Sequence, residues 1–357
     1  MDHALRRKQL ADALTDASVD AFLVTRLPNV RYLAGYTGSN GQLLLFEGDA
    51  RFFTDSRYEE QAKREVPDVE RIIYAGEFVN ALRDALLASA GIRRLAFETS
   101  GITFKTYEQV REIEPLELVP LEDAVERLRW SKDDEEIKLI QRAQRITDEA
   151  FDRVLGSLRE GVTERDVAFD LEVAMRRAGA ERVAFDAIVA FGENAAEPHH
   201  RPSARKLMKG DVVKLDFGCV VDGYHSDMTR TIAFGEPDPR LREIHDLVRK
   251  AHEAGALAVR TGAEGGTCDA AARAVITDAG HGSRFGHGLG HGVGLEIHEG
   301  PTLRKEGTDV LPENAVVTVE PGVYVPGLGG VRIEDMVVVG EDGCRPLPKT
   351  TKEFLVL

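Results

Sequence analysis

The sequence has 357 residues, 43% of them hydrophobic and 30% charged, a balance typical of a soluble globular protein with about two domains. Its 61 acidic and 46 basic residues give a formal charge of -15, which argues against nucleic acid or an anionic membrane as the main partner and favours cations. Three separated cysteines, no apolar leader and no apolar run of about 18 residues predict a cytoplasmic protein without a disulfide framework or a membrane span.

Residues 1–125 predict an α/β domain, because short apolar strands alternate with helical patterns. Apolar spacing indicates helices over 2–18, 77–89 and 103–113, and strands over 21–24, 42–47, 51–55, 71–75 and 94–98. Two dipeptides are typical of turns: Pro28-Asn29 after the first strand, and Gly48-Asp49 between two strands that it would join as a hairpin.

Residues 131–357 are expected to form a second domain that begins with a long helix. Ser131 is the expected N-cap, and the acids at 133–136 crowd the first turn, where the helix dipole favours negative charge. A buried stripe starts at Ile137, and the helix should run for about 28 residues and stop before Gly161. Further helices, separated by strands rich in β-branched residues, are expected over 163–179, 239–261 and 267–279. Helices followed by strands occur twice, which indicates a duplicated architecture.

Two aspartates are predicted to share one face of a hairpin. Asp222-Gly223 is a strong two-residue turn, and a hairpin centred on it pairs Asp216 with Thr229 and Gly218 with Asp227. Side chains alternate along a strand, so Asp216 and Asp227 become diagonal neighbours within about 7–8 Å. The alternative, that both point into solvent, is disfavoured because Asp216 lies in a mostly apolar run. Two such carboxylates repel each other unless a cation lies between them.

Two glutamates follow a similar pattern near the end of the chain. Glu320 and Glu334 lie in two apolar strands on either side of the glycine-rich loop 326–330. A register centred on Gly327 places the two glutamates opposite each other, although a loop with three glycines allows other registers. As members of a set of four acids in apolar strands, they are poor candidates for surface residues.

Four buried carboxylates require positive charge. These strands contain Lys214, Arg230 and Arg332, and two arginines cannot neutralise four acids and also leave a function for the histidines. Hard divalent ions can do so, because carboxylate oxygens suit ions such as Mn²⁺. Two Asp, two Glu and one His form a sensible shell for two ions about 3.5–4 Å apart that share a hydroxide.

Three histidines, His287, His291 and His298, lie in the glycine-rich stretch 286–299. Glycine allows the backbone to pass close to a crowded site, so one histidine is expected to bind metal and the others to act on substrate. Two other motifs are excluded here. Gly300-Pro301 follows His298-Glu299, so there is no HExxH zinc helix, and no Lys-Ser/Thr completes a phosphate-binding P-loop.

These residues resemble the pita-bread metallopeptidases, in particular the proline-directed branch with Xaa-Pro dipeptidase (prolidase) and aminopeptidase P. The matching segments are LDFGCVVDGYHSDMTRT, GHGLGHGVGLEIHEGP, TVEPGVY and VRIED, supported by IVAFGENAAEPHHRP, VRYLAGYTGSNG and FFTDSRYEEQA. The resemblance implies an α/β (α+β) protein: a mixed α/β domain of creatinase/prolidase type over 1–125, and a pita-bread catalytic domain over 131–357 with a curved, mainly antiparallel sheet flanked by helices.

The resemblance also implies roles for individual residues. Two divalent metal ions per subunit, with Mn²⁺ expected and Co²⁺ or Zn²⁺ as alternatives, would be bound by Asp216, Asp227, His291, Glu320 and Glu334, of which Asp227 and Glu334 would bridge both. His199 and His298 would contact the scissile carbonyl or the tetrahedral intermediate, Glu320 would transfer a proton, and His287 and Arg332 would line the pocket or orient ligands. His199 is preferred over its neighbour His200 because it directly follows Pro198.

The implied activity is hydrolysis of the Xaa-Pro bond by a hydroxide that bridges two metals. Xaa-Pro dipeptides are preferred as substrates because the chain is compact, and the expected partners are small proline-containing peptides and a second subunit in a homodimer. The main alternative is an aminopeptidase P that acts on longer peptides. A methionine aminopeptidase would not need residues 1–125, and an inactive pita-bread binding module is disfavoured because all five ligand positions are filled.

Several assignments stay open at this point. Arg304 and Lys305 are candidates to bind the substrate carboxylate, although a solvated loop is the preferred interpretation. Tyr324 either reaches the pocket or belongs to the core. Cys219 is expected to be a small buried residue without redox function. The physiological metal and the preference for the residue before proline are not predicted.

Overall fold

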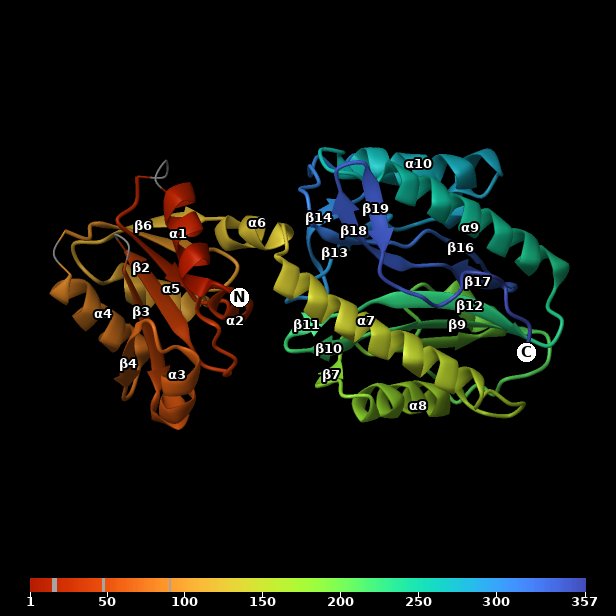
Figure 1. Ribbon diagram of the computed structural model, residues 1–357, viewed down its shortest axis with the longest axis horizontal. Coiled ribbons are helices and arrows are strands. Elements are labelled where there is room, and N and C mark those ends of the chain that lie inside the picture. Colours follow the sequence, from red (N-terminus) through yellow and green to blue (C-terminus); the bar gives the residue numbers. More distant parts are fainter. Residues whose placement is uncertain (15–17, 47–48, 90) are drawn as a thin grey trace. The chain divides into compact units, whose positions relative to one another are not determined.

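The computed structural model describes residues 1–14, 18–46, 49–89 and 91–357 (Figure 1). The chain divides into two compact units, Met1–Arg129 and Trp130–Leu357. No helix within the described ranges is both long and apolar enough to cross a membrane.

The first unit is built on one mixed sheet, for which the described residues give the strand order β4-β3-β2-β1-β5-β6. Its strands are β1 (Ala21–Val24), β2 (Gln42–Phe46), β3 (Asp49–Asp55), β4 (Glu70–Tyr74), β5 (Arg94–Glu98) and β6 (Glu117–Leu121). Its helices are α1 (His3–Leu14), α2 (Leu27–Ala34), α3 (Glu59–Glu65), α4 (Phe78–Ala88), α5 (Phe104–Arg111) and α6 (Ala124–Trp130), whose last residue belongs to the second unit. Strand β1 pairs antiparallel with β2 and parallel with β5, so the predicted α/β organisation is confirmed.

Local predictions for this unit had mixed outcomes. The turn predicted at Pro28-Asn29 is wrong, because both residues lie in the first turn of α2, where a missing proline N–H costs no hydrogen bond. Strands β2 and β3 pair antiparallel as predicted, with Phe46 opposite Asp49, while Gly48 of the expected turn lies outside the described residues. Helix α1 is described over His3–Leu14, and positions 15–17 of the helix predicted over 2–18 lie outside the described residues.

The second unit contains two helix pairs, and each pair is followed by strands. The first group is α7 (Asp134–Leu155), α8 (Glu164–Arg177), β7 (Arg182–Val183), β8 (Ile188–Phe191), β9 (Asp211–Phe217), β10 (Cys219–Val221), β11 (Tyr224–His225) and β12 (Met228–Phe234). The second group is α9 (Pro239–Ala258), α10 (Gly265–Asp278), β13 (Gly290–Gly292), β14 (Glu299–Leu303), β15 (Val316–Val319), β16 (Gly322–Val325), β17 (Gly329–Arg332), β18 (Asp335–Gly340) and β19 (Gly343–Pro346). Short 3₁₀ helices lie at Ser56–Tyr58, Gly192–Ala196 and Gly282–Arg284.

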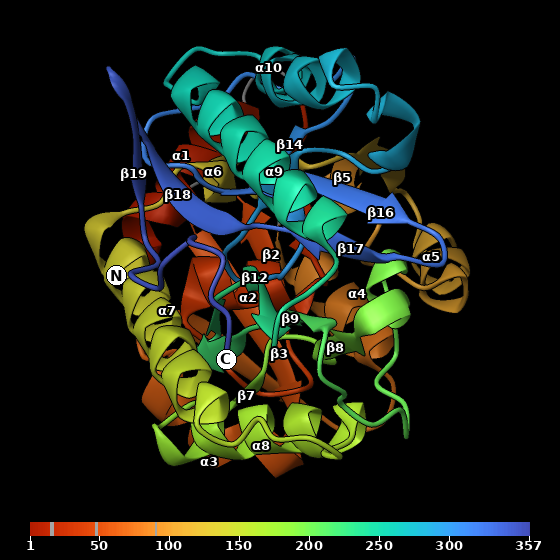
Figure 2. The same ribbon diagram turned by 90° about the vertical axis from the view of Figure 1, so that its right-hand side faces the viewer.

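Each helix pair shares a hydrophobic core with the strands that follow it. Phe151 of α7 and Leu171 of α8 pack in one cluster with β9 and β12, and Val248 of α9 and Ala272 of α10 pack in another with β15 and β18. The strands therefore lie between the two helix pairs (Figures 1 and 2), and the pairings between the strands of this unit are antiparallel. This agrees with the predicted mainly antiparallel sheet flanked by helices.

Helix α7 begins and ends at different residues from those predicted. Asp133, not Ser131, is the N-cap: its carboxylate accepts from the backbone N–H of Glu136 at 2.9 Å, and the Glu136 carboxylate accepts from the Asp133 N–H at 2.9 Å. This capping box satisfies two N–H groups at once, which a serine two residues earlier could not do. The Ser131 hydroxyl instead donates to the Glu313 carbonyl at 2.7 Å. The helix has 22 residues and ends before Gly156.

Both predicted strand registers are confirmed. Asp216 of β9 pairs with Thr229 of β12, as a hairpin centred on Asp222-Gly223 requires. Around the second loop, Gly322 pairs with Arg332, and Val319 pairs with Asp335. Both pairs fit a register centred on Gly327. Asp216 therefore lies on a ladder, and Asp227, Glu320 and Glu334 lie next to ladder pairs, at positions that depend on the two turns.

Candidate metal centre

The four acids lie where the strand ladders end or break. Asp216 is near the end of β9, Asp227 comes between β11 and β12, Glu320 between β15 and β16, and Glu334 between β17 and β18. Asp216, Asp227 and Glu334 are only 7%, 4% and 2% exposed, and Glu320 is partly exposed. The acids thus lie at or next to strand ends, and the prediction that they avoid the surface is confirmed for three of them and in part for Glu320.

The glycines around His291 allow two strands to come close together. A Cβ atom on Gly290 would lie 1.9 Å from the Thr318 carbonyl oxygen, and one on Gly292 would lie 2.2 Å from the Gly300 carbonyl oxygen. Any side chain at these two positions would force the backbones apart. Glycine is therefore required on both sides of the histidine, as the sequence indicated.

The His291 imidazole points toward the acids. Its Nδ1 lies 3.1 Å from the Gly292 carbonyl oxygen, so Nδ1 carries the proton and donates it, which leaves the Nε2 lone pair free. Nε2 lies 3.7 Å from Asp227 Oδ2 and 3.5 Å from Glu320 Oε1. Ligand atoms of Asp227, His291 and Glu334 all lie within 4.8 Å of one another. Such a set can hold a metal ion.

Two carboxylate oxygens in this cluster lack hydrogen-bond partners among the residues that the structure describes. Within the described residues, Oδ1 of Asp216 and Oδ1 of Asp227 are buried and accept no hydrogen bond. A buried oxygen without a partner costs free energy unless a ligand satisfies it. The donor set, mostly carboxylate oxygen with one imidazole, suits hard divalent ions such as Mn²⁺. The residues present therefore fit a metal centre.

The pKa values of the clustered residues also indicate that the acids require cations. Burial, together with the nearby charges of Glu334 and Asp216, raises the pKa of Asp227 well above its usual range. Burial likewise raises the pKa of Glu334 strongly and that of Glu320 to about 8. Burial lowers the pKa of His291 to about 4, so this imidazole is neutral at pH 7. The acids must therefore take up either protons or cations.

The nearby basic residues do not meet this demand. The buried Lys214 ammonium faces the carbonyl oxygens of Ala195 and Glu197, at 3.1 and 2.5 Å, and burial lowers its pKa to about 6. Arg332 forms an ion pair with Asp216 and so compensates one of the four acids. The expectation that the arginines cannot neutralise the acids agrees with these contacts.

Arg332 and Thr229 connect the acids to each other. Arg332 Nε donates to Thr229 Oγ1 at 3.0 Å, and Thr229 Oγ1 donates to Glu334 Oε2 at 2.6 Å. Arg332 thus orients Asp216 directly and Glu334 through a hydroxyl group. Sequence reasoning placed Thr229 opposite Asp216 but gave it no role, although the shared face of the strand was a usable signal.

Tyr324 joins Arg332 to His287. Its hydroxyl accepts from Arg332 Nη1 at 2.8 Å and lies 2.9 Å from His287 Nε2, to which it donates, because His287 Nδ1 donates to the Gly288 carbonyl at 2.8 Å. Burial lowers the pKa of His287 to about 4, which keeps it neutral. The question left open for Tyr324 is thereby resolved: it is buried, yet its hydroxyl belongs to the network of the site.

A cavity of about 540 Å³ opens next to the acids, and His199, His200 and His298 are among its lining residues. His200 is held by carboxylates on both ring nitrogens, Glu197 at 2.6 Å and Glu164 at 2.9 Å. Within the described residues, His199 makes no such bond and is exposed, which favours His199 over His200 as the residue that acts in the cavity.

The cavity also contains residues that the sequence left open or did not single out. Arg201 and Arg304 line it and form no ion pair within the described ranges, whereas the exposed Lys305 pairs with Glu306 at 3.8 Å. Phe185 and Ile297 give it an apolar wall. Cys219 does not line the cavity: it is buried, and its thiol donates to the Ala143 carbonyl at 3.4 Å, in agreement with the prediction of a small core residue.

Comparison with known families decides the class. Residues 138–341 match metallopeptidase family M24, and residues 6–130 match the creatinase/prolidase N-terminal domain. The chain belongs to metallopeptidase family M24. This M24 enzyme is 41% identical over 354 residues to the uncharacterized peptidase YqhT of Bacillus subtilis, which covers 99% of this chain and 100% of that one.

Two solved structures resemble this M24 enzyme over all or nearly all of its length. A structure described as Xaa-Pro dipeptidase from Bacillus anthracis matches with a TM-score of 0.97 and 40% identity and covers 100% of both chains. A structure described as X-Pro aminopeptidase from Thermotoga maritima matches with a TM-score of 0.90 and 36% identity, covering 97% of this chain and 100% of that chain. The predicted α/β fold with a pita-bread domain is confirmed by these likenesses.

Proposed function

We propose that this M24 metallopeptidase hydrolyses the Xaa-Pro bond of small peptides, with Xaa-Pro dipeptides as the preferred substrates. The observation that carries the proposal is a buried set of four acids and one neutral imidazole that opens into a cavity and has two carboxylate oxygens without partners among the described residues. The Bacillus anthracis relative is described as an Xaa-Pro dipeptidase, which supports this substrate class.

The residues proposed to hold the metal are Asp216, Asp227, His291, Glu320 and Glu334, of which Asp227 and Glu334 would serve both ions. Two divalent ions, expected to be Mn²⁺ with Co²⁺ or Zn²⁺ as alternatives, would lower the pKa of a bound water so that hydroxide is available near neutral pH. We assign to Glu320 the transfer of a proton from water to the proline nitrogen, and its side chain, 18% accessible and the most exposed of the four acids, supports that role.

The remaining site residues act on the substrate or on the ligands. His199 and His298 line the cavity, and an imidazole N–H can donate to the carbonyl oxygen as negative charge develops on it. Arg332 orients Asp216 and Glu334, and His287 is held in place through Tyr324. The proline nitrogen of the scissile bond has no N–H, so the ring must be recognised by shape, for which Phe185 and Ile297 provide an apolar wall.

The second candidate is an aminopeptidase P activity on longer peptides, because the Thermotoga maritima relative is described as an X-Pro aminopeptidase. The two activities differ in where the substrate ends. A dipeptide presents its terminal carboxylate one residue beyond the scissile bond, and Arg201 and Arg304 line the cavity as cations that could bind it. This favours the dipeptidase. A cytoplasmic homodimer is part of the same proposal, and sedimentation velocity of the purified protein tests the dimer.

One preparation loaded with Mn²⁺ and assayed on three peptides tests the proposal. Cleavage of Ala-Pro alone supports the dipeptidase, and release of alanine from Ala-Pro-Ala supports aminopeptidase P. Preferential cleavage of Met-Ala-Ala would contradict proline specificity. Bound metal without activity on any of the three would contradict the hydrolytic proposal and leave a pita-bread binding module. An EDTA-treated aliquot of the same preparation, which should be inactive, serves as the control.

A further inference from the structure

A buried arginine lies behind the acid cluster, on the opposite side of Glu334. Arg230 of β12 is 2% exposed and donates from all three guanidinium nitrogens. Nη1 donates to the carbonyl oxygens of Thr229 at 3.0 Å and Glu334 at 2.6 Å. Nη2 donates to Asp335 Oδ1 at 2.8 Å and to the Thr350 carbonyl at 2.8 Å. These contacts attach the backbone of Glu334 to a distant part of the chain.

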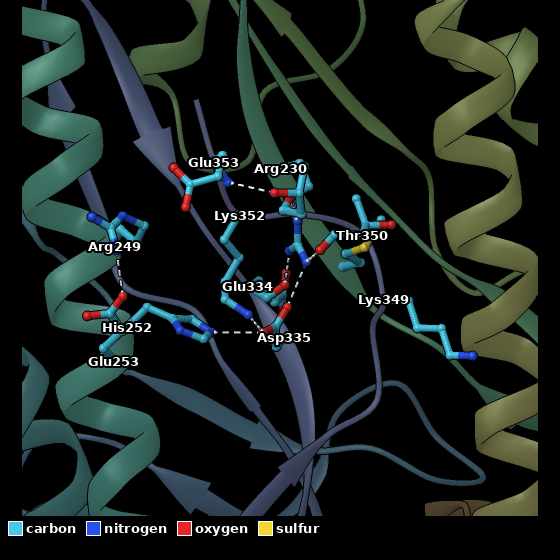
Figure 3. Close-up of polar contacts among 12 residues, drawn as sticks. Arg230, Arg249, His252, Glu253, Glu334, Asp335, Lys349, Thr350, Lys352 and Glu353 are labelled. Carbon is cyan, nitrogen blue, oxygen red and sulfur yellow. Dashed lines mark hydrogen bonds and ion pairs between the residues drawn. The ribbon is translucent and has the colours of Figure 1, made fainter. Parts of the chain in front are cut away.

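That distant part is the C-terminal segment, residues 349–357. Arg230 Nε donates to the Thr351 carbonyl at 2.9 Å, and Lys352 Nζ donates to Asp335 Oδ2 at 2.6 Å. Figure 3 shows Arg230 and Lys352 converging on Asp335 beside Glu334. The segment is anchored beyond this point as well, because the Leu355 carbonyl accepts from the Ala233 N–H at 2.9 Å. The C-terminal segment is therefore anchored, and its carbonyl groups hold the Arg230 side chain in place.

We propose that Arg230, held by the C-terminal segment, is a positioning residue for the metal ligand Glu334. Glu334 is fixed at both ends: Thr229 Oγ1 donates to its carboxylate at 2.6 Å, and Arg230 donates to its carbonyl at 2.6 Å. A carboxylate shared between two ions must keep both its position and its orientation, and partners outside the ligand shell provide this. This inference rests on the proposed function, because it takes Glu334 as a ligand.

The positive charge of Arg230 does not compensate the four acids of the cluster. Its direct carboxylate partner is Asp335, at 2.8 Å, on the far side of the strand from the acid cluster. The contribution to the metal centre is therefore geometric. Lysine would keep the positive charge but has three donors on one nitrogen, so it cannot reach the carbonyls of Glu334, Thr350 and Thr351 together. Arg230→Lys thus separates geometry from charge.

The test measures Mn²⁺ binding to metal-free protein by titration calorimetry, with metal content determined independently. Arg230→Lys is expected to raise the dissociation constant of at least one ion about 10- to 100-fold, the range typical of such partners. The matched control is Arg205→Lys, which removes a bidentate pair with Asp211, at 2.7 and 2.9 Å, in the same unit. The control should lower the melting temperature and leave the dissociation constants unchanged.

Other outcomes have defined meanings. Arg230→Lys protein that melts earlier but binds Mn²⁺ as the wild type does would reduce Arg230 to a structural residue and overturn the inference. If that variant does not fold, Lys352→Met takes its place, because the Lys352 side chain is 30% exposed and easier to replace. A weaker Mn²⁺ affinity of Lys352→Met supports the inference, and an unchanged affinity overturns it. Wild-type protein that binds no divalent ion would instead overturn the proposed function.

Discussion

Glu334 and Asp335 are neighbours in the chain, yet they meet opposite environments. Glu334 joins Asp216, Asp227 and Glu320, and it accepts a neutral hydrogen bond from Thr229 at 2.6 Å. Asp335 is 0% exposed and pairs with two cations, Arg230 at 2.8 Å and Lys352 at 2.6 Å. Adjacent residues of an extended chain face opposite sides of a sheet. At the start of β18, Glu334 therefore points toward the other acids and Asp335 points toward its two cations.

The two acids therefore respond differently to the same degree of burial. Burial and the charges of Glu320 and Asp216 raise the pKa of Glu334 far above its usual range. Burial also acts to raise the pKa of Asp335, but the charges of Arg230 and Lys352 outweigh it, and the pKa is lowered. A buried acid with its own cations serves the fold, whereas buried acids without enough cations form a place for ions to bind.

We call the side of the strand that carries Glu334, with Asp216, Asp227 and Glu320, the acid-rich side. The largest expected effect comes from removing one carboxylate charge there. Asp227→Asn should lower kcat/KM for Ala-Pro by about 10³-fold or more, because it removes a proposed ligand that stabilises the transition state through the bound ions. Its metal content should fall in parallel, as measured by elemental analysis of purified protein. Retention of both activity and metal by Asp227→Asn would exclude this residue from the site.

Neutralising Asp335 and Glu334 in separate variants tests directly whether the two carboxylates serve different purposes. In metal-free protein, Asp335→Asn should lower the free energy of unfolding by about 3 kcal/mol, because it leaves the buried Arg230 and the partly buried Lys352 without their carboxylate partner. Glu334→Gln should change it by about 1 kcal/mol or less, since the amide relieves repulsion among the acids and can still accept from Thr229. Urea unfolding in EDTA measures both values. Equal losses in the two variants would contradict the distinction drawn here.

The turns made only the Glu334 side of this strand predictable. Asp222-Gly223 and the loop around Gly327 determine their registers locally, so the convergence of the acids followed from turn chemistry and side-chain alternation. The Asp335 side gave no such signal, because its partner Lys352 lies 17 residues away and Arg230 lies 105 residues away. Contacts between distant positions leave no periodic trace in the sequence.

The other differences arise from residue types that suit more than one local structure and, for Tyr324, from a distant partner. Pro28-Asn29 was predicted as a turn because proline and asparagine favour turns, but the first turn of a helix accepts them equally well. Tyr324 was ambiguous, since its partner His287 is 37 residues distant. Ser131 was predicted as the cap of α7, and Asp133 was placed in the first turn, but aspartate also caps helices and the reciprocal bond to Glu136 decided the position.

The pH dependence of the stability of the metal-free protein should be set by the clustered acids, Glu320 among them. The pKa of Glu320 is raised from 4.5 to about 8, so between these values the folded state holds a proton that the unfolded state has lost. Stability therefore falls as pH rises through this window, the opposite of the contribution from Asp335, whose lowered pKa favours the folded state above its usual value. In EDTA, the melting temperature should drop by a few degrees from pH 5.5 to 8, at about 2–4 °C per kcal/mol.

Saturating Mn²⁺ is the control for this titration. Bound ions replace the protons on the acids, so the melting temperature should be higher at pH 8 and should no longer fall across the window. An identical decline with and without Mn²⁺ would place the responsible groups elsewhere in the molecule. It would also remove the electrostatic argument that the acid cluster requires cations.

The smallest predicted effect concerns Arg332, the arginine that pairs with Asp216. Tyr324 connects Arg332, at 2.8 Å, to His287, at 2.9 Å, through a single hydroxyl group. Tyr324→Phe removes that connection while leaving all proposed ligands in place, so kcat/KM should fall about 3- to 10-fold, as expected for one hydrogen bond. Metal content should stay at the wild-type level.

Tyr224→Phe is the matched control, because Tyr224 is also buried in the second unit and donates to Glu136 at 2.8 Å, in a contact that involves none of the proposed ligands. It should lose stability to a similar degree without losing activity. If Tyr324→Phe lost bound metal, the Arg332–Tyr324 bond would be holding the ligands themselves. The acid-rich side would then depend on its internal cation for assembly, as the Asp335 side does, and the contrast between the two faces would be one of degree.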